Sequence, residues 1–513
     1  MANKAIFASA RRADTTVNDA GGLAYAMDAP AALAQYVMTG TFNSTFYADA
    51  KADTGRVVGL GRQVAPEFLA KLAVFAREAG YMKDAPAVLL AVLSTRAPEL
   101  FRLAFPRVID NGKMLRTFVQ IVRSGLAGRK SLGSAPKRMI ADFLASAPDS
   151  LLINAVGQDP SLADVIRLAR PKAGDASREA AFGYFIGKVA ANDARLPEAI
   201  RRLEAFRAGE SLDLPKVDFR LLDSLPLSAE NWKEIARSAP WQATRMNLNS
   251  FARRGVFEDG ALTRKIADRL RDPALIARSK VFPYQLLAAY LNIDPAVPAI
   301  VAEALIDAAE TATENVPVIA GRVFVFPDVS GSMRSPATGY RRGASSKVRC
   351  VDVAALVAAA ILRKNPQAEV IPFEGRVVPL RLSPRDSLLT NAEKLAAVGG
   401  GSTACSAPLR LLNDRKAHGD LLVYVSDNES WLDAGRKSQT ETDAQWTLFS
   451  KRNPEAKLAC IDITPNATTQ VRALPNVLNV GGFSDAVFDA LAAFASGELA
   501  GDGLVARVNR VVL

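Results

Sequence analysis

The spacing of apolar residues changes near residue 315, and this change constrains the fold more than any other feature of the chain. From about residue 17 to residue 314 the sequence is rich in Ala and Leu, and its apolar residues recur three and four positions apart. Pro and Gly interrupt the pattern at intervals. Since this spacing gives an α-helix one apolar face, the first part of the chain is predicted to be helical.

Successive helices in this part are predicted to form antiparallel pairs. One helix carries Phe68 and Phe75 on its apolar face and ends near Gly80, and a second begins after Pro86. Similar pairs are expected at residues 114–144, 162–188, 232–254 and 262–290. Stacked pairs form a HEAT-like solenoid, and we expect the rest of the chain to cover its terminal apolar faces and close it into a ring.

After residue 315, short β-branched runs alternate with helical segments. The runs are GRVFVFPD, AEVIPF, LLVYVSD, LACIDI and NVLNV, and the helical segments include residues 351–363 and 486–494. Alternation of this kind predicts a parallel, doubly wound α/β sheet with both faces covered. The predicted domains are therefore a helical-repeat domain at 17–315 and a Rossmann-like α/β domain at 320–513.

Hydroxyl and carboxyl side chains follow three of the predicted strands. Asp328, Ser330 and Ser332 come after the first strand as a DxSxS loop, Thr403 belongs to a GGGST loop, and Asp427 follows the strand LLVYVS. The carboxyl ends of parallel strands meet at one edge, where ligands bind. Since hard cations prefer oxygen ligands, these five residues predict a site for a divalent metal of the Mg²⁺ type. The DxSxS loop alone could be an ordinary Ser/Gly-rich turn.

The order of these five residues resembles the metal-ion-dependent adhesion site of von Willebrand factor A domains. The resemblance implies that Mg²⁺ is the bound ion and that an acidic group of a partner can reach it.

The helical part resembles the TROVE module of the Ro autoantigen family. The similarity begins at NDAGGLAYAMD (residues 18–28) and YVMTGTFNSTFYADAKA (residues 36–52), and it continues through LAGRKSLGSAPKRMIADFL, RPKAGDASREAAFGYFIGK, RMNLNSFARRGVF and SKVFPYQLLAAY. The family's opening is usually closer to GSEGGTYY, whereas this chain has TGTFNSTFY with Thr45, Phe46 and Tyr47 retained.

The resemblance to the Ro family implies a bacterial Ro-like ribonucleoprotein that takes part in RNA quality control or decay. The resemblance implies binding of small noncoding Y-like RNA on a basic outer surface and of single-stranded ends of misfolded RNA in a central hole. It also implies an exoribonuclease partner such as polynucleotide phosphorylase, and no catalytic centre of the chain's own. We further expect a monomer.

Positive charge gathers in one stretch of the helical part. The chain has a formal net charge of +11. Nine cations have only Asp110 and Asp142 as nearby acids: Arg102, Arg107, Lys113, Arg116, Arg123, Arg129, Lys130, Lys137 and Arg138. Paired cations beside Gly and Ser donors suit backbone phosphates, although a charge run is often only a solvated helix face. The predicted RNA contacts are Arg116, Arg123, Arg129, Lys130, Lys137, Arg138, Arg253 and Arg254, and the insertion at residues 334–347 is a weaker candidate.

The small numbers of histidine and cysteine residues limit the classes of catalytic and metal site that the chain could form. The single histidine, His418, leaves little from which to build a triad or a His-ligated zinc site, and the three cysteines are too scattered for a disulfide framework. The longest apolar run, residues 353–362, is too short to cross a bilayer, so we expect a cytoplasmic protein with no membrane partner. One competing hypothesis is a metal-dependent protein-interaction scaffold without RNA. Another is a metal-dependent hydrolase, which would need a general base near Asp328.

Overall fold

The computed structural model describes most of the chain. The described residues are 15–39, 42–157, 160–217, 219–222, 225, 227–279, 281, 283–314, 316–340, 347–433, 439–482, 485–499 and 503–513. Two compact units are present. The helical unit comprises residues 54–281, 285–312 and 508–513, and the sheet unit comprises residues 1–53, 282–284 and 313–507. The domain limits predicted from the sequence, 17–315 and 320–513, stay a prediction.

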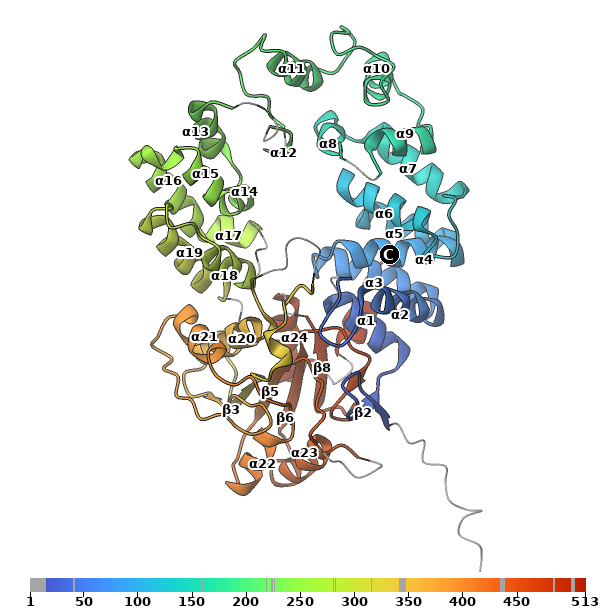
Figure 1. Ribbon diagram of the computed structural model, residues 1–513. Coiled ribbons are helices and arrows are strands. Elements are labelled where there is room, and N and C mark those ends of the chain that lie inside the picture. The colour runs from blue at the N-terminus through green and yellow to red at the C-terminus, as the bar shows by residue number, and fades with distance from the viewer. Residues whose placement is uncertain are drawn as a thin grey trace, which may run out of the picture. The chain divides into compact units, whose positions relative to one another are not determined.

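The helical unit is built of short helices in close succession (Figure 1). The first are α2 (Ala50–Gln63), α3 (Pro66–Glu78), α4 (Asp84–Arg96), α5 (Pro98–Val108), α6 (Gly112–Ser124), α7 (Ser134–Ser146), α8 (Asp149–Asn154), α9 (Leu162–Ala169), α10 (Ala176–Phe185), α11 (Glu198–Arg207) and α12 (Phe219–Leu222). They are followed by α13 (Ala229–Ser238), α14 (Trp241–Met246), α15 (Leu248–Arg253), α16 (Gly260–Arg271), α17 (Pro273–Ser279), α18 (Pro283–Leu291) and α19 (Ala299–Ala312). The prediction of a helical first part is confirmed.

Helix α6 shows how the sequence sets the local fold. The side chain of Asn111 accepts a hydrogen bond from the Met114 amide and caps the first turn, and Gly125 ends the helix in the left-handed region at φ 84°. The apolar face of α6 is buried, and Phe118 stacks on Phe101 with ring centroids 5.8 Å apart. Helix α4 packs on α3, α5 and α6, so neighbours in sequence are neighbours in space.

The predicted helix pair at residues 232–254 differs in detail. This stretch forms three helices, α13, α14 and α15. Pro240 precedes α14, where it has no amide hydrogen to donate to the preceding turn, and Asn247 separates α14 from α15. The spacing of apolar residues predicted that this stretch is helical, but it did not predict the breaks at Pro240 and Asn247.

The sheet unit contains a five-stranded sheet in which every neighbouring pair is parallel (Figure 1). The strands lie in the order β4 (Glu369–Val370), β3 (Val323–Pro327), β5 (Leu421–Ser426), β6 (Lys457–Asp462) and β8 (Val477–Gly481). These are the five predicted strands. The predicted doubly wound α/β fold is confirmed.

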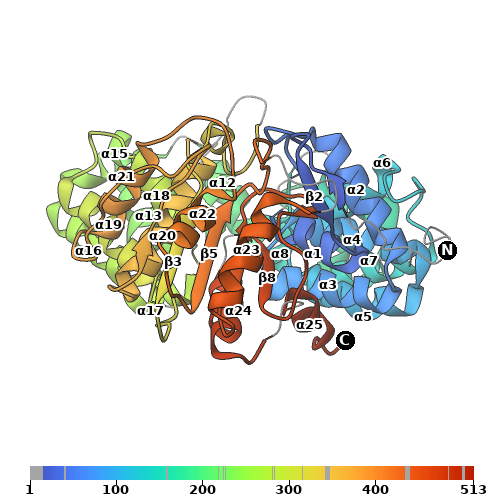
Figure 2. The same ribbon diagram turned by 90° about the horizontal axis from the view of Figure 1, so that it is seen from below.

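Helices cover both faces of the parallel sheet. The flanking helices are α20 (Cys350–Lys364), α21 (Leu388–Ala396), α22 (Ala407–Asp414), α23 (Glu441–Arg452) and α24 (Asp485–Ser496), followed by α25 (Gly503–Asn509). Phe324, Phe326 and Tyr424 belong to a buried cluster with side chains of α22 and α23. Helix α20 packs on β3, β4 and β5, and α24 lies along β8 (Figure 2). Within the described residues, no helix is long and apolar enough to cross a membrane.

The sheet unit also includes the N-terminal segment, here residues 15–49, which the sequence analysis did not foresee. Strands β1 (Thr15–Val17) and β2 (Leu23–Ala26) form an antiparallel sheet with β7 (Thr468–Thr469), and α1 (Ala29–Thr39) packs on β8. The fit is close at Gly22, where a Cβ atom would lie 1.9 Å from the carbonyl oxygen of Ser430. A side chain at this position would therefore push the segment away.

Replacing Tyr25 by phenylalanine is expected to loosen this segment. The Tyr25 hydroxyl donates to Asp443 Oδ2 over 3.1 Å and accepts from the Thr440 amide over 3.3 Å. Losing both bonds in a buried setting is expected to cost about 1–3 kcal/mol. Hydrogen exchange of residues 15–26, measured by mass spectrometry, should rise in Tyr25→Phe, while exchange in α3 and α4 should not change. Unchanged protection of residues 15–26 would show that these bonds contribute little.

Candidate functional site: an acidic strand edge and a basic groove

Two carboxylates meet at the carboxyl edge of the parallel sheet. Asp328 follows β3, and Asp427 follows β5, its hydrogen-bonded neighbour. The two side chains are buried, with exposed fractions of 0% and 2%. Asp328 Oδ1 accepts from the Ser330 amide over 2.8 Å, and Oδ2 accepts from the Ser426 hydroxyl over 2.6 Å. Neither carboxylate has a Lys or Arg partner among the described residues.

Burial raises the pKa of both carboxylates. Burial, followed by the charge of Asp427, raises the pKa of Asp328 to about 7, although hydrogen bonds from Ser330 and Ser426 oppose the shift. Burial also raises the pKa of Asp427, against a hydrogen bond from Ser332. A divalent cation would compensate both charges, as a proton does at lower pH.

The hydroxyl ligands predicted from the sequence are buried at the same edge. Ser330 Oγ lies 3.4 Å from Ser332 Oγ, and the exposed fractions of Ser330 and Ser332 are 0% and 7%. Among the described residues, no three His, Cys, Asp or Glu side chains gather in a geometry that could hold a metal. A cation at this edge therefore depends on hydroxyl oxygens as well as on the two carboxylates.

The loop that carries Thr403 is bonded to the DxSxS loop. The amide of Gly331 donates to the Gly401 carbonyl, and the amide of Gly400 donates to the Val329 carbonyl, both over 2.8 Å. This approach requires glycine at position 399, where φ is +75° and a Cβ atom would lie 2.4 Å from the Val329 oxygen. Thr403 itself is 1% exposed. The structure thus brings together the loops that bear all five predicted ligands.

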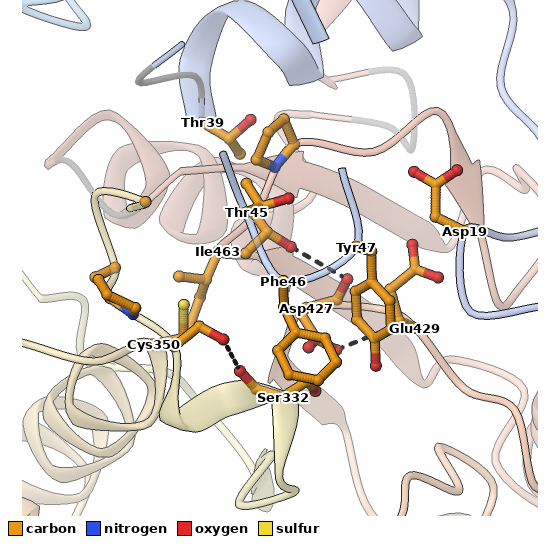
Figure 3. A pocket seen from close by; sticks show the side chains of 16 residues that line it. Asp19, Thr39, Thr45, Phe46, Tyr47, Ser332, Cys350, Asp427, Glu429 and Ile463 are labelled. Carbon is orange, nitrogen blue, oxygen red and sulfur yellow. Dashed lines mark hydrogen bonds between the residues drawn. The ribbon is translucent and has the colours of Figure 1, made fainter. Parts of the chain in front are cut away.

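A small pocket opens beside these ligands and has the N-terminal segment as one wall. Its volume is about 20 Å³, which is room for one ion or water molecule. Ser332 and Asp427 line it together with Phe46 and Tyr47 (Figure 3). The sequence gives no sign that this loop lies near the cation ligands, because no local pattern relates residues so far apart in the chain.

The structure also gathers several predicted RNA contacts around a groove at the start of α7. Lys130, Lys137 and Arg123 line this groove, here named the α7 groove, which has a volume of about 380 Å³. Ser131 and Ser134 lie in its wall, and no side chain of the described residues caps the first turn of α7. The three cations are exposed and have no ion-pair partner among the described residues. Cationic side chains and free helix amides together suit a phosphate group.

The remaining predicted RNA contacts differ in exposure. Arg138 is exposed on α7, one residue beyond Lys137. Arg129 points inward, since its Nη2 donates to Ser94 Oγ over 2.9 Å and burial lowers the pKa of its guanidinium. Arg116 is half-buried, and its Nη1 donates to the Pro160 carbonyl over 3.4 Å.

The pair at the end of α15 lies at the surface. Arg253 is exposed and bonds Ser250, and Arg254 is exposed with its guanidinium 5.3 Å from the centre of the Trp232 ring. For the weaker candidate at residues 334–347, positions 341–346 lie outside the described residues.

Comparisons with known proteins agree with this architecture. A family model for the Ro60 vWA domain matches residues 322–495, and one for the TROVE domain matches residues 162–342. The chain belongs to the Ro family. It is 27% identical to the RNA-binding protein RO60 of Deinococcus radiodurans, over 94% of this chain and 95% of that protein. The crystal structure of the Deinococcus radiodurans RO (RSR) protein superposes with a TM-score of 0.63 at 22% identity, over 92% of this chain and all of the other.

A second basic groove escaped the sequence analysis. It lies between α9 and α10, has a volume of about 960 Å³ and is here named the α9–α10 groove. Its exposed cations are Arg167, Arg170, Lys172, Lys188 and Arg195. Two acids, Asp175 and Glu179, share the lining, so no run of like charge marks the groove in the sequence. The spacing of Arg167 and Arg170 at the end of an amphipathic helix is a sequence feature that could have indicated this groove.

The single histidine lies away from the acidic edge. His418 precedes β5, whereas Asp427 follows it, so the strand separates the two residues. The His418 ring bonds Asn453 Oδ1 over 3.1 Å. All three cysteines are buried with free thiols. The hydrolase hypothesis therefore gains no general base from these residues.

Proposed function

We propose that this chain is a Ro-like RNA-binding protein. The observation that carries the proposal is the α7 groove, where three exposed cations surround the start of a helix and have no ion-pair partner within the part of the chain that the structure describes. RNA presents a phosphate at every nucleotide, and phosphate contacts fix a protein on RNA without reading its sequence. The name of the Deinococcus radiodurans relative, an RNA-binding protein, supports the same function.

The two grooves support recognition of phosphates rather than of base sequence. In the α9–α10 groove, Arg170, Lys172 and Lys188 have no ion-pair partner among the described residues, whereas Arg167 and Arg195 are paired with aspartates. Free cations contribute more to polyanion binding, since a paired cation must first leave its carboxylate. We therefore expect structured and single-stranded RNA to bind with similar dependence on salt.

The finer features of the family are part of the proposal. We propose that the bound RNA is a small noncoding RNA of the Y type, together with single-stranded ends of misfolded RNA, and that an exoribonuclease such as polynucleotide phosphorylase acts with the complex. On this proposal the chain itself is a cytoplasmic, monomeric quality-control protein that performs no catalysis.

We also propose that Asp328, Ser330, Ser332, Thr403 and Asp427 hold one Mg²⁺-type ion. Two buried carboxylates that have no basic partner in the described part of the chain, together with adjacent hydroxyls, are a donor set that suits a hard cation. The ion would supply positive charge at the strand edge.

The test of the RNA proposal is binding by the full chain. Protein purified from its native cell should carry nucleic acid that ribonuclease removes, and sequencing that RNA would name the ligand. A fluorescent hairpin with a 3′ single-stranded tail should bind, with an affinity whose logarithm falls linearly with the logarithm of salt concentration. A nucleic-acid-free preparation that carries a protein partner and ignores the hairpin would instead support the scaffold hypothesis.

A further inference from the structure

The pocket beside the cation ligands is closed on one side by the chain's own N-terminal segment. This segment is held at several points along the carboxyl edge of the parallel sheet. Asn18 Nδ2 donates to the Ser430 carbonyl over 2.9 Å, and the Ala20 amide donates to Glu429 Oε2 over 2.9 Å. Further along, Gln35 Nε2 donates to the buried Asp462 over 2.6 Å. The segment is therefore an integral part of this edge.

The loop at residues 42–48, here named the cover loop, is fixed above the DxSxS turn. The Tyr340 amide donates to the Ser44 carbonyl over 2.8 Å, and Asn43 Nδ2 donates to the Thr338 carbonyl over 2.7 Å. Inside the loop, the Thr45 amide donates to the Ala48 carbonyl over 2.8 Å. These bonds hold the loop against residues 338–340, which follow the DxSxS turn in sequence.

The cover loop presents one oxygen to the cation ligands. Tyr47 and Ser332 line the same small pocket, and Figure 3 shows the Tyr47 ring beside Asp427 and Glu429. A phenol is neutral near pH 7, so the Tyr47 hydroxyl would bring no charge to a cation. Phe46 packs edge-on against Tyr47 with ring centroids 4.8 Å apart and is itself 57% exposed.

Charge favours such a neutral ligand over a partner's carboxylate. Asp328 and Asp427 already balance the two positive charges of a divalent ion, and Glu429 and Asp462 lie buried nearby with exposed fractions of 3% and 1%. Another carboxylate entering from outside would add repulsion in a dry setting, whereas a phenol adds none.

We propose that the cation site takes an internal ligand: the hydroxyl of Tyr47, directly or through one water molecule, fills the position that a partner's acidic group would otherwise reach. The bound cation then fastens the N-terminal segment to the parallel sheet and is closed to partners. This inference rests on the cation proposal above, and it is independent of RNA binding.

The experiment uses the full chain freed of metal by a chelator and reloaded with Mg²⁺ or Mn²⁺. With Mg²⁺, hydrogen exchange of the cover loop should slow by roughly tenfold in the wild type, since one metal-linked contact is comparable to a hydrogen bond to a charged group. Paramagnetic resonance of bound Mn²⁺ should not change when acetate is added. Tyr47→Phe removes only the hydroxyl, so Mn²⁺ should still bind, acetate should now alter its spectrum, and Mg²⁺ should no longer slow exchange in the loop.

Two further variants are controls. Tyr340→Phe removes a hydroxyl from a tyrosine that is 48% exposed, and it should behave as the wild type. Asp427→Asn removes a cation ligand, and it should abolish the Mg²⁺ effect on the cover loop even if Tyr47→Phe folds poorly.

Three results would overturn the inference: a wild type that binds no Mn²⁺, acetate that reaches Mn²⁺ in the wild type as readily as in Tyr47→Phe, or cover-loop exchange that ignores Mg²⁺. The affinity for hairpin RNA, measured on the same samples, distinguishes failure of the Tyr47 inference from failure of the proposed RNA-binding function. Loss of the inference leaves RNA binding intact, and an absence of RNA binding leaves the Mn²⁺ results unaffected.

Discussion

Removing four cations in and beside the α7 groove is expected to weaken RNA binding by roughly 100-fold or more at moderate salt, because each phosphate contact releases counterions. The variant replaces these residues with alanine: Arg123, Lys130, Lys137 and Arg138. With somewhat under one unit of slope per contact, the dependence of log affinity on log salt should flatten by about 3 units. Fluorescence anisotropy with the tailed hairpin, measured across salt concentrations, gives both quantities.

Arg129 is left in place in this variant. Its guanidinium bonds Ser94 on α4, and burial lowers its pKa, so its removal would disturb packing as well as charge. The four chosen side chains are exposed, and solvated cations contribute little to stability. The thermal unfolding of the variant should therefore match that of the wild type, which separates loss of contacts from loss of fold.

A control variant removes the same amount of charge elsewhere. Four exposed cations outside both grooves are replaced with alanine: Arg264, Lys265, Arg381 and Arg385. It should lose little affinity, because long-range attraction is screened at moderate salt whereas direct contacts are not. Equal losses in both variants would make the α7 groove an ordinary solvated surface. The search would then move to Arg170, Lys172 and Lys188 in the α9–α10 groove.

Local patterns explain which parts of the fold the sequence predicted. The five parallel strands were found because each is a short apolar run between helical segments, and the loops with Asp328 and Asp427 follow strands that pair with each other. The parallel order then requires that the two carboxylates meet. The positions of Asp328 and Asp427 in the sequence were therefore sufficient to predict that the two carboxylates lie at one edge of the sheet.

The N-terminal segment was missed for the opposite reason. Strands β1 and β2 have three and four residues, too few to show an alternating pattern, and the bond from Asn18 to Ser430 spans 412 positions. The direction in which a surface cation points could not be predicted from the sequence either. Arg129 and Lys130 are adjacent and alike in sequence, yet one bonds Ser94 inside the helical unit and the other lines the α7 groove.

Replacing Asp328 by asparagine is expected to stabilise the folded chain in the absence of a cation, and Mg²⁺ is expected to offset this difference by stabilising the wild type. Without a cation, the folded chain holds Asp328 at a pKa of about 7 against an ordinary value of 3.8. The folded state thus binds a proton that the unfolded state has lost between these values. Stability should fall as pH rises from about 4 to about 7, and the full penalty, on the order of 2–4 kcal/mol, should remain above that range.

Asparagine carries no charge, so the variant escapes this penalty. Its side chain can still accept from the Ser330 amide and can donate to the Ser426 hydroxyl, which preserves both contacts of Asp328. Near pH 8 in chelator, Asp328→Asn should therefore unfold at a higher temperature than the wild type, and the difference should shrink as pH falls and vanish below about pH 4.

Mg²⁺ should then stabilise only the wild type. At a concentration 100 times its dissociation constant, a ligand adds about 2.7 kcal/mol to the folded state. Asp328→Asn lacks the ionised ligand and should gain little. Asp414→Asn, which neutralises an exposed aspartate at the end of α22, is the matched control and should follow the wild type in chelator and in Mg²⁺.

Thermal unfolding measured across pH, with and without Mg²⁺, tests whether Asp328 is a cation ligand. Calorimetric titration measures cation binding directly. A wild type that Mg²⁺ does not stabilise at pH 8, and that titrates no heat, would leave the acidic edge a pair of proton-sharing carboxylates. Equal stabilisation of the wild type and Asp328→Asn would place the cation elsewhere. Either result would remove Asp328 from the ligand set, because a buried carboxylate that holds a metal cannot be replaced by an amide without loss of affinity.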